Sequence, residues 1–151
     1  MDEITYTIKK ATANDIEAHL LICNHQFVPP LSNKVEIASY SNKIYDKAIT
    51  FEAWNKSQLI GVIATYFNYE EQFGFITNVS VDPNWTGKGI AATLLKNCID
   101  YTVNNKFNTV SLEVNRNNTK AIGLYTKFGF ETESQKEDSL MMKWKNKQNI
   151  K

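Results

Sequence analysis

The sequence predicts an α+β protein built on a mixed sheet of about seven strands with flanking helices. Residues 49–81 contain three β-rich segments joined by short polar turns, a pattern typical of an antiparallel meander. The third segment leads through a turn with two glycines into an apolar-periodic helix at about 90–104, and an alternating strand follows at 110–114. A strand, a helix and a strand of these lengths predict a parallel pair with a right-handed crossover.

Two helices are expected before the meander. Thr12 with Asp15 resembles a capping box for a first helix that runs to about residue 25. The Pro29-Pro30 pair behind it forces an extended loop. Asn33 with Glu36 is expected to start the second helix, because asparagine is a favoured N-cap residue.

A fourth helix and the remaining strands complete the prediction. Asn118 is expected to cap a short helix that ends near Phe128, and Gly129 is placed as the residue after its C-cap. Strands are expected at residues 4–8, 49–54, 59–69, 73–81, 110–114, 130–134 and 139–145. The last two are expected to form a hairpin.

Length and composition indicate one globular domain, which we place at residues 1–145, followed by a polar tail at 146–151. The chain has 151 residues, 42% of them hydrophobic and 22% charged, with a formal net charge of +1. The near-neutral charge argues against nucleic acid as a partner. Arg116 is the only arginine, so an anion would be bound largely by backbone groups and lysine.

Several other classes of protein are disfavoured. The first residues lack the basic and apolar regions of a secretory signal, and no apolar run is long enough to span a membrane, so we expect a cytoplasmic protein with no membrane partner. Cys23 and Cys98 lie in separate helical apolar patterns and are expected to be reduced core thiols. His19 and His25 are not spaced four residues apart from each other, so no metal site is predicted.

The segment from Val81 to Ala92 is the most informative stretch of the chain. A strand that ends in a glycine-containing turn and opens a helix presents backbone N–H groups that the helix itself cannot satisfy. The helix dipole adds partial positive charge, and Gly87 and Gly89 let the backbone approach an anion closely. The turn therefore predicts a site for a phosphate or pyrophosphate.

Two signatures resemble those of the GNAT superfamily of acetyl-coenzyme A dependent N-acetyltransferases. The family's pyrophosphate motif, Gln/Arg-x-x-Gly-x-Gly/Ala, matches Thr86, Gly89 and Ala91, although threonine replaces the usual long polar side chain. Downstream, residues 112–130 are similar to the family's strand followed by N-x-x-A-x-x-L-Y-x-x-x-G-F, and this half resembles the ribosomal-protein alanine acetyltransferase branch. The resemblance implies the GNAT fold, acetyl-CoA as cosubstrate and acetyl transfer to a primary amine.

The resemblance also implies where the cosubstrate binds. In this family acetyl-CoA lies between two parallel strands that separate at a bulge in the first strand, which corresponds to residues 77–81 and 112–115 here. The pantetheine amides complete the unpaired strand edges, and a free N–H near Val79 would polarise the thioester carbonyl. The implied cofactor-binding residues are Val79, Ser80, Val81, Thr86, Gly87, Lys88, Gly89, Ile90, Ala91, Ala92, Asn115, Asn118 and Tyr125.

Tyr125 and Glu113 are the catalytic residues that the resemblance implies. Family members with this tyrosine use it as the acid that protonates the departing coenzyme A thiolate. In the alanine acetyltransferase branch a glutamate at the place of Glu113 acts as the base. A water positioned by Asn78 would serve instead if Glu113 only lies on a solvated strand face.

The sequence says least about which amine accepts the acetyl group. Phe27 and Asn78 are candidates for the substrate side, and Tyr40 and Tyr45 could line the same pocket. The acceptor could be a peptide N-terminus, a lysine, an amino sugar or an antibiotic-like amine, bound by a monomer or a homodimer.

Two alternatives are kept open. The first is a non-catalytic domain that binds acetyl-CoA as a sensor or scaffold. The second is a dinucleotide-binding domain, because Gly87-x-Gly89-x-x-Ala92 also fits that fingerprint with Glu113 at about the expected separation. A meander in place of an alternating βαβ series before the turn argues against the second.

Overall fold

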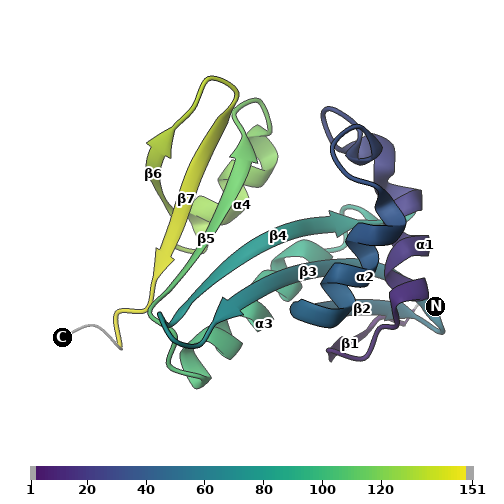
Figure 1. Ribbon diagram of the computed structural model, residues 1–151, viewed down its shortest axis with the longest axis horizontal. Coiled ribbons are helices and arrows are strands. Elements are labelled where there is room, and N and C mark those ends of the chain that lie inside the picture. Colours follow the sequence, from purple (N-terminus) through teal and green to yellow (C-terminus); the bar gives the residue numbers. More distant parts are fainter. Residues whose placement is uncertain (1–2, 149–151) are drawn as a thin grey trace.

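The computed structural model describes residues 3–148 and places all the predicted strands in one sheet (Figure 1). The strands are β1 (Thr5–Ile8), β2 (Ile49–Asn55), β3 (Gln58–Asn68), β4 (Phe73–Val81), β5 (Thr109–Asn115), β6 (Glu131–Gln135) and β7 (Ser139–Lys145). Their order across the sheet is β1-β2-β3-β4-β5-β7-β6, with β4 and β5 parallel and every other neighbouring pair antiparallel. The predicted mixed sheet of seven strands is therefore confirmed.

Four α-helices flank the sheet: α1 (Ala13–Cys23), α2 (Ile37–Lys47), α3 (Ile90–Asn104) and α4 (Thr119–Lys127). In Figure 1, α1 and α2 lie on one face of the β2–β3–β4 region, α3 lies on the opposite face, and α4 lies beside β5 and β7. Each face has its own apolar core, with Leu20 and Ile44 in the first and Leu94 and Leu95 in the second. The α1–α2 segment and the β5–α4–β7 segment thus stand on either side of β4.

Two helix boundaries differ from the prediction. Residues Leu31–Asn33 form a separate 3-10 turn, so Asn33 does not cap α2. Glu36 is the N-cap instead, and its carboxylate accepts a hydrogen bond of 2.9 Å from the Ser39 backbone N–H. Helix α1 begins with the predicted Thr12–Asp15 capping box but ends at Cys23, and a further 3-10 turn covers Asn24–Gln26.

The end of α4 shows why β6 starts one residue later than predicted. Gly129 follows the helix at φ = 100°, in the left-handed region, as expected for a residue after the C-cap. The Phe130 N–H then bonds back to the Tyr125 carbonyl at 3.0 Å, and the Phe130 side chain is buried in the core. Phe130 therefore belongs to the helix stop, and the strand begins at Glu131.

The predicted tail at 146–151 is described only as far as residue 148. Asn146 is buried, and its backbone and side-chain amides donate to the carbonyls of Asn108 and Phe107 at 2.8 and 3.0 Å. Residues 149–151 lie outside the described part of the chain. Among residues 3–148, no helix combines the length and apolar character that crossing a bilayer requires.

Strands β4 and β5 pair over only part of their length. Their ladder runs from Phe73–Thr109 to Ile76–Leu112, while β4 continues to Val81 and β5 continues to Asn115. Both strands stay paired on their outer sides, with β3 and β7 respectively. Within residues 3–148, the inner edges beyond Ile76 and Leu112 have no strand partner, which is the separation expected from the family resemblance, and Figure 1 shows the two strands diverging.

Candidate active site

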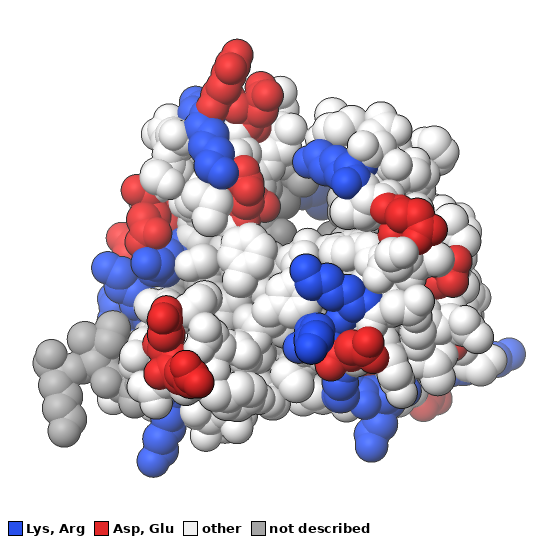
Figure 2. Space-filling view, in the orientation of Figure 1, with Lys and Arg blue, Asp and Glu red and all other residues white. Residues whose placement is uncertain are grey.

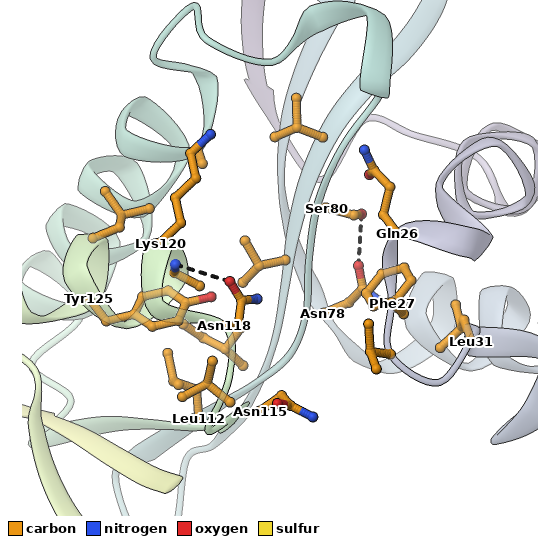
Figure 3. A pocket seen from close by; sticks show the side chains of 18 of the residues that line it. Gln26, Phe27, Leu31, Asn78, Ser80, Leu112, Asn115, Asn118, Lys120 and Tyr125 are labelled. Carbon is orange, nitrogen blue, oxygen red and sulfur yellow. Dashed lines mark hydrogen bonds between the residues drawn. The ribbon is translucent and has the colours of Figure 1, made fainter. Parts of the chain in front are cut away.

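A cleft of about 1040 Å³ opens between the diverging ends of β4 and β5. Figure 2 shows the corresponding notch in the surface, on a face where acidic and basic side chains are interspersed. In the close view of Figure 3, α4 and the loop before it form one wall, with Tyr125, Asn118 and Lys120. The other wall carries Phe27 and Asn78.

A β-bulge in β4 separates the two strands. Ala64 of β3 pairs with Asn78, but the next residue, Thr65, pairs with Ile76, so Thr77 is the extra residue. The Tyr40 hydroxyl, from α2, donates to the Thr77 carbonyl at 2.9 Å and lies 2.8 Å from its hydroxyl oxygen. Tyr40 therefore holds the displaced segment in place.

The bulge also decides which β4 side chains face each wall. Beyond it, Val79 and Val81 pack against the α3 side of the sheet. Asn78 and Ser80 face the α1 side, where the Ser80 hydroxyl lies 2.9 Å from His19 Nε2. One strand thus gives its backbone edge to the cleft and its polar side chains to the α1–α2 wall.

The glycine turn at the top of the cleft is uncapped. Gly87 and Gly89 have φ values of 79° and 75°, and a Cβ at either position would meet no atom within 4 Å. Gly89 is the N-cap residue of α3 and provides no side-chain cap, and the first backbone bond runs from Thr93 N to Gly89 O at 3.0 Å. Within residues 3–148, the backbone N–H groups of 87–92 have no protein acceptor. They form an open set of donors at the positive end of a helix.

Two residues of the predicted pyrophosphate motif contribute little side-chain chemistry. The Thr86 hydroxyl donates to the Pro83 carbonyl at 3.2 Å, which ties it to its own turn. The Lys88 ammonium lies 6.0 Å from the centre of the Trp85 ring, and Lys88 is not among the residues that line the cleft. The donors that the described turn offers to the cleft are therefore chiefly backbone N–H groups.

Tyr125 belongs to α4 and lines the cleft on the α4 wall. Its side chain is 5% exposed, its ring is 5.8 Å from that of Phe130, and its hydroxyl points into the cleft (Figure 3). Asn118 caps α4 through a 3.2 Å bond from the Ala121 N–H, as predicted from the sequence. Burial raises the pKa of Tyr125 to about 12, so the phenol keeps its proton at neutral pH and can donate it.

Glu113 lines the cleft from β5 but already has partners. Its carboxylate accepts a 2.5 Å hydrogen bond from the Ser139 hydroxyl and lies 3.5 Å from the Lys136 ammonium. The Ser139 bond, with Lys136 nearby, lowers the pKa of Glu113 below its usual value. The side chain is 41% exposed, so this carboxylate is ionised, solvated and weakly basic.

The family model named Acetyltransferase (GNAT) family matches residues 17–130 of the sequence. The chain belongs to the GNAT acetyltransferase family. The matched region runs from α1 to the end of α4 and includes the bulge, the glycine turn and Tyr125. No curated protein sequence matches the chain significantly.

Solved structures share the same GNAT fold at low sequence identity. The ribosomal-protein-S18-alanine N-acetyltransferase of Escherichia coli is 20% identical over 96% of this chain and 94% of its own, with a TM-score of 0.75. Arabidopsis thaliana NAA60, crystallised with a bisubstrate analogue, is 18% identical over 93% of this chain and 98% of its own, with a TM-score of 0.77. The PaiA N-acetyltransferase of Thermoplasma acidophilum, crystallised with coenzyme A, is 19% identical over 94% and 99%, with a TM-score of 0.74.

The GNAT fold brings the predicted site residues together from four separate segments. All of the catalytic, cofactor and substrate candidates line the one cleft, except Lys88. Tyr40 also lines it, but Tyr45 does not: its side chain is 46% exposed and stacks near the Lys9 ammonium. Ile44 of α2 faces the core, and Tyr45, the next residue along the helix, points to solvent. The assignment of Tyr45 to the pocket was therefore wrong.

Three residues in or behind the cleft were not predicted from the sequence. Lys34 and Lys120 line the cleft on opposite walls, and single lysines in a lysine-rich chain give no sequence signal. His19 is 1% exposed behind the α1–α2 wall, and burial lowers its pKa to about 4. The available signal was a polar residue on the apolar face of α1 between Ile16 and Cys23, which was considered only as a metal ligand.

Proposed function

We propose that this GNAT protein is an N-acetyltransferase that moves an acetyl group from acetyl-CoA to a primary amine by direct attack in a ternary complex. The observation that carries the proposal is the cleft itself. Unpaired β4 and β5 edges meet an uncapped helix N-terminus there, so one extended ligand with amides and a pyrophosphate matches both features.

The cosubstrate would bind largely through the backbone. The pyrophosphate would accept hydrogen bonds from the N–H groups of residues 87–92, and the pantetheine amides would pair with the free edge of β4 at Val79–Val81 and with Asn115 on β5. Asn118 and Lys120 lie on the opposite wall of the same cleft. The described hydrogen-bond donors at the turn are chiefly backbone N–H groups. Pyrophosphate binding therefore does not depend on the Gln or Arg that the family motif has in place of Thr86.

In the proposed reaction the amine nitrogen attacks the thioester carbonyl carbon. A C–N bond forms, the C–S bond breaks, and its electron pair leaves on the sulfur of coenzyme A. A free N–H near Val79 would stabilise the negative charge that develops on the carbonyl oxygen. Tyr125 donates its phenolic proton to the thiolate and regains one from solvent, so the products are the N-acetyl amine and free coenzyme A thiol.

The attacking nitrogen must also lose a proton. We propose Glu113 as the carboxylate that takes it, with a water held near Asn78 as the other route. The Ser139 bond lowers the pKa of Glu113, so the carboxylate is ionised and ready to accept, but it binds a proton weakly. A water route predicts a pH–rate profile that Glu113→Gln leaves unshifted.

Ligand-linked stabilisation followed by thiol release tests the proposal. At ~100 times the dissociation constant, acetyl-CoA should stabilise the fold by about 2.7 kcal/mol, while NAD should not stabilise it. Release of coenzyme A thiol is then followed with a panel of amines. Stabilisation by NAD alone would contradict the proposal, and stabilisation by acetyl-CoA with no thiol release from any amine would indicate a sensor.

A further inference from the structure

His19 belongs to a buried polar chain behind the α1–α2 wall and has no role in the chemistry described so far. His19 Nε2 lies 2.9 Å from the Ser80 hydroxyl oxygen, and that hydroxyl donates to Asn78 Oδ1 at 2.8 Å. The three side chains come from α1 and β4, and they are 1%, 6% and 4% exposed. Figure 3 shows the Ser80–Asn78 bond at the cleft wall, beside Phe27.

The orientation of the Asn78 amide determines where the protons in this chain lie. A serine hydroxyl carries a single proton, and Ser80 gives it to Asn78 Oδ1, which is an acceptor only. With the Asn78 amide in this orientation, the proton between His19 and Ser80 belongs to His19 Nε2. Burial lowers the pKa of His19 to about 4, so the ring is neutral at pH 7 and has this one N–H.

The fixed bonds determine which end of the Asn78 amide is left for a ligand. Oδ1 is engaged by Ser80, so the free end is the amide nitrogen Nδ2, which only donates. Asn78 also lies near enough to Tyr40 to lower the pKa of that phenol, a contact that uses at most one of the two N–H bonds of Nδ2. Asn78 lines the cleft directly before Val79, where the thioester carbonyl is proposed to lie.

We propose that His19 and Ser80 hold the Asn78 amide with its N–H donor toward the acceptor, and that the acceptor is an amine whose neighbouring carbon carries a carbonyl oxygen. This inference rests on the proposed acetyl transfer. A donor beside the reacting nitrogen matches an oxygen acceptor only a few bonds away, and an α-amino carbonyl group provides one. In this arrangement His19 is a positioning residue that acts through Ser80 and Asn78.

The role of His19 follows from what its removal allows. Without the Nε2–H donor, the Ser80 hydroxyl can turn and accept from Asn78 Nδ2, and the amide can then present Oδ1 to the cleft. His19→Phe removes the donor with a ring of similar size, whereas His19→Gln places an amide N–H at about the position of Nε2. The two variants therefore separate loss of the donor from loss of packing.

The tautomer of His19 tests the inference without any activity measurement. The chain has two histidines, His19 and His25, so long-range ¹H–¹⁵N NMR of the imidazole rings resolves both. The expected result is a neutral His19 with its proton on Nε2 at pH 7. A proton on Nδ1 would overturn the inference, because Ser80 would then donate to His19 and the Asn78 amide would be reversed.

Substrate discrimination tests the acceptor class. The probes are alaninamide, sec-butylamine, which lacks the carbonyl, and 2-amino-1-propanol, which replaces it with a hydroxyl. The measured quantity is the ratio of kcat/KM for alaninamide to that for sec-butylamine, relative to wild type, so that differences in amine basicity cancel. Asn78→Ala is expected to lower this ratio about tenfold and His19→Phe about threefold, with His19→Gln within about twofold of wild type.

Each other outcome has a definite meaning. Equal losses for both amines in Asn78→Ala, or a wild-type kcat/KM for 2-amino-1-propanol equal to that for alaninamide, would overturn the α-amino carbonyl assignment while leaving acetyl transfer standing. Binding of acetyl-CoA with no transfer to any amine would instead contradict the proposed function. The acetyl-CoA dissociation constant should stay unchanged in all three variants, since none alters the glycine turn.

Discussion

The two walls of the cleft are built in different ways. The proposed cosubstrate side is built from two short segments, residues 79–92 and 112–125, and apart from the Tyr125 side chain its chemistry comes from backbone groups set by a bulge, two positive-φ glycines and a helix cap. On the acceptor side, Phe27, Tyr40 and Asn78 come from distant segments, and their chemistry comes from side chains. Backbone features leave local marks in a sequence, whereas contacts between distant side chains do not.

This contrast predicts that changes on the cosubstrate wall act on all substrates, and that changes on the acceptor wall act selectively. The largest effect is expected at Tyr125. Tyr125→Phe should lower turnover by roughly 10²–10⁴-fold, because the departing thiolate loses its proton donor. Steady-state kinetics with any accepted amine would measure it.

The control for Tyr125→Phe is the acetyl-CoA dissociation constant, which should stay nearly unchanged, since the ring is kept and its packing on Phe130 with it. Unaltered turnover would remove Tyr125 from the mechanism.

The next largest effect is expected at the glycine turn. Gly89→Ala forces a side chain to adopt φ = 75°, which costs about 1–2 kcal/mol, so the turn should relax and the affinity for acetyl-CoA should fall about tenfold. Isothermal titration with acetyl-CoA would measure this loss.

Gly123→Ala is the matched control for the turn. Gly123 lies in α4 without a positive φ, and an added Cβ would meet no atom within 4 Å. This variant should stabilise the fold by about 0.5–1 kcal/mol and leave acetyl-CoA affinity unchanged. If both variants bound acetyl-CoA like wild type, the backbone conformation at Gly89 would not matter for the site.

A smaller effect is expected at the bulge. Tyr40→Phe removes the donor to the Thr77 carbonyl, so the free energy of unfolding should fall by about 0.5–1.5 kcal/mol. The loss would be measured by urea unfolding, and protection of the β4 amides from hydrogen exchange should fall with it. An unchanged exchange pattern would show that the bulge holds without Tyr40.

The smallest effect is expected at Glu113. A carboxyl whose pKa is lowered in the folded state stabilises that state above its unfolded pKa, and the contribution is lost as pH falls through the folded value. Ser139→Ala removes the largest cause of the shift, so the pKa of Glu113 should rise toward its usual value and stability at pH 7 should drop by less than about 1 kcal/mol.

Side-chain carboxyl NMR across a pH titration would measure the Glu113 change directly. Wild type and Ser139→Ala should converge in stability at low pH, where Glu113 is protonated in both states. A Glu113 titration curve that is the same in both proteins would contradict the assigned cause.

Most of the fold could be predicted because its signals are local. The alternation of Val110, Leu112 and Val114 predicted β5, and the spacing from Asn118 to Gly129 predicted both ends of α4. The predicted start of α2 was wrong because an asparagine at position 33 suits a helix cap and a 3-10 turn equally well. Sequence alone does not decide between them.

In the candidate site, too, the features with local sequence signals were predicted and the long-range contacts were not. The open strand edges and the free N–H groups of 87–92 were expected from the glycine turn and the family resemblance. The bond from Tyr40 to Thr77 joins residues 37 positions apart, and the contact between His19 and Ser80 joins residues 61 positions apart. No local pattern marks such a pair. Glu113 was placed correctly on the cleft, but its partners Ser139 and Lys136 come from another hairpin strand and its turn.

An amide ¹H–¹⁵N NMR titration with acetyl-CoA tests directly whether the cosubstrate binds through the backbone. Binding through the backbone predicts the largest shifts at residues 87–92, with further shifts along the inner edges of β4 and β5. Saturable binding that leaves the amides of 87–92 unshifted would show that the glycine turn does not bind the pyrophosphate.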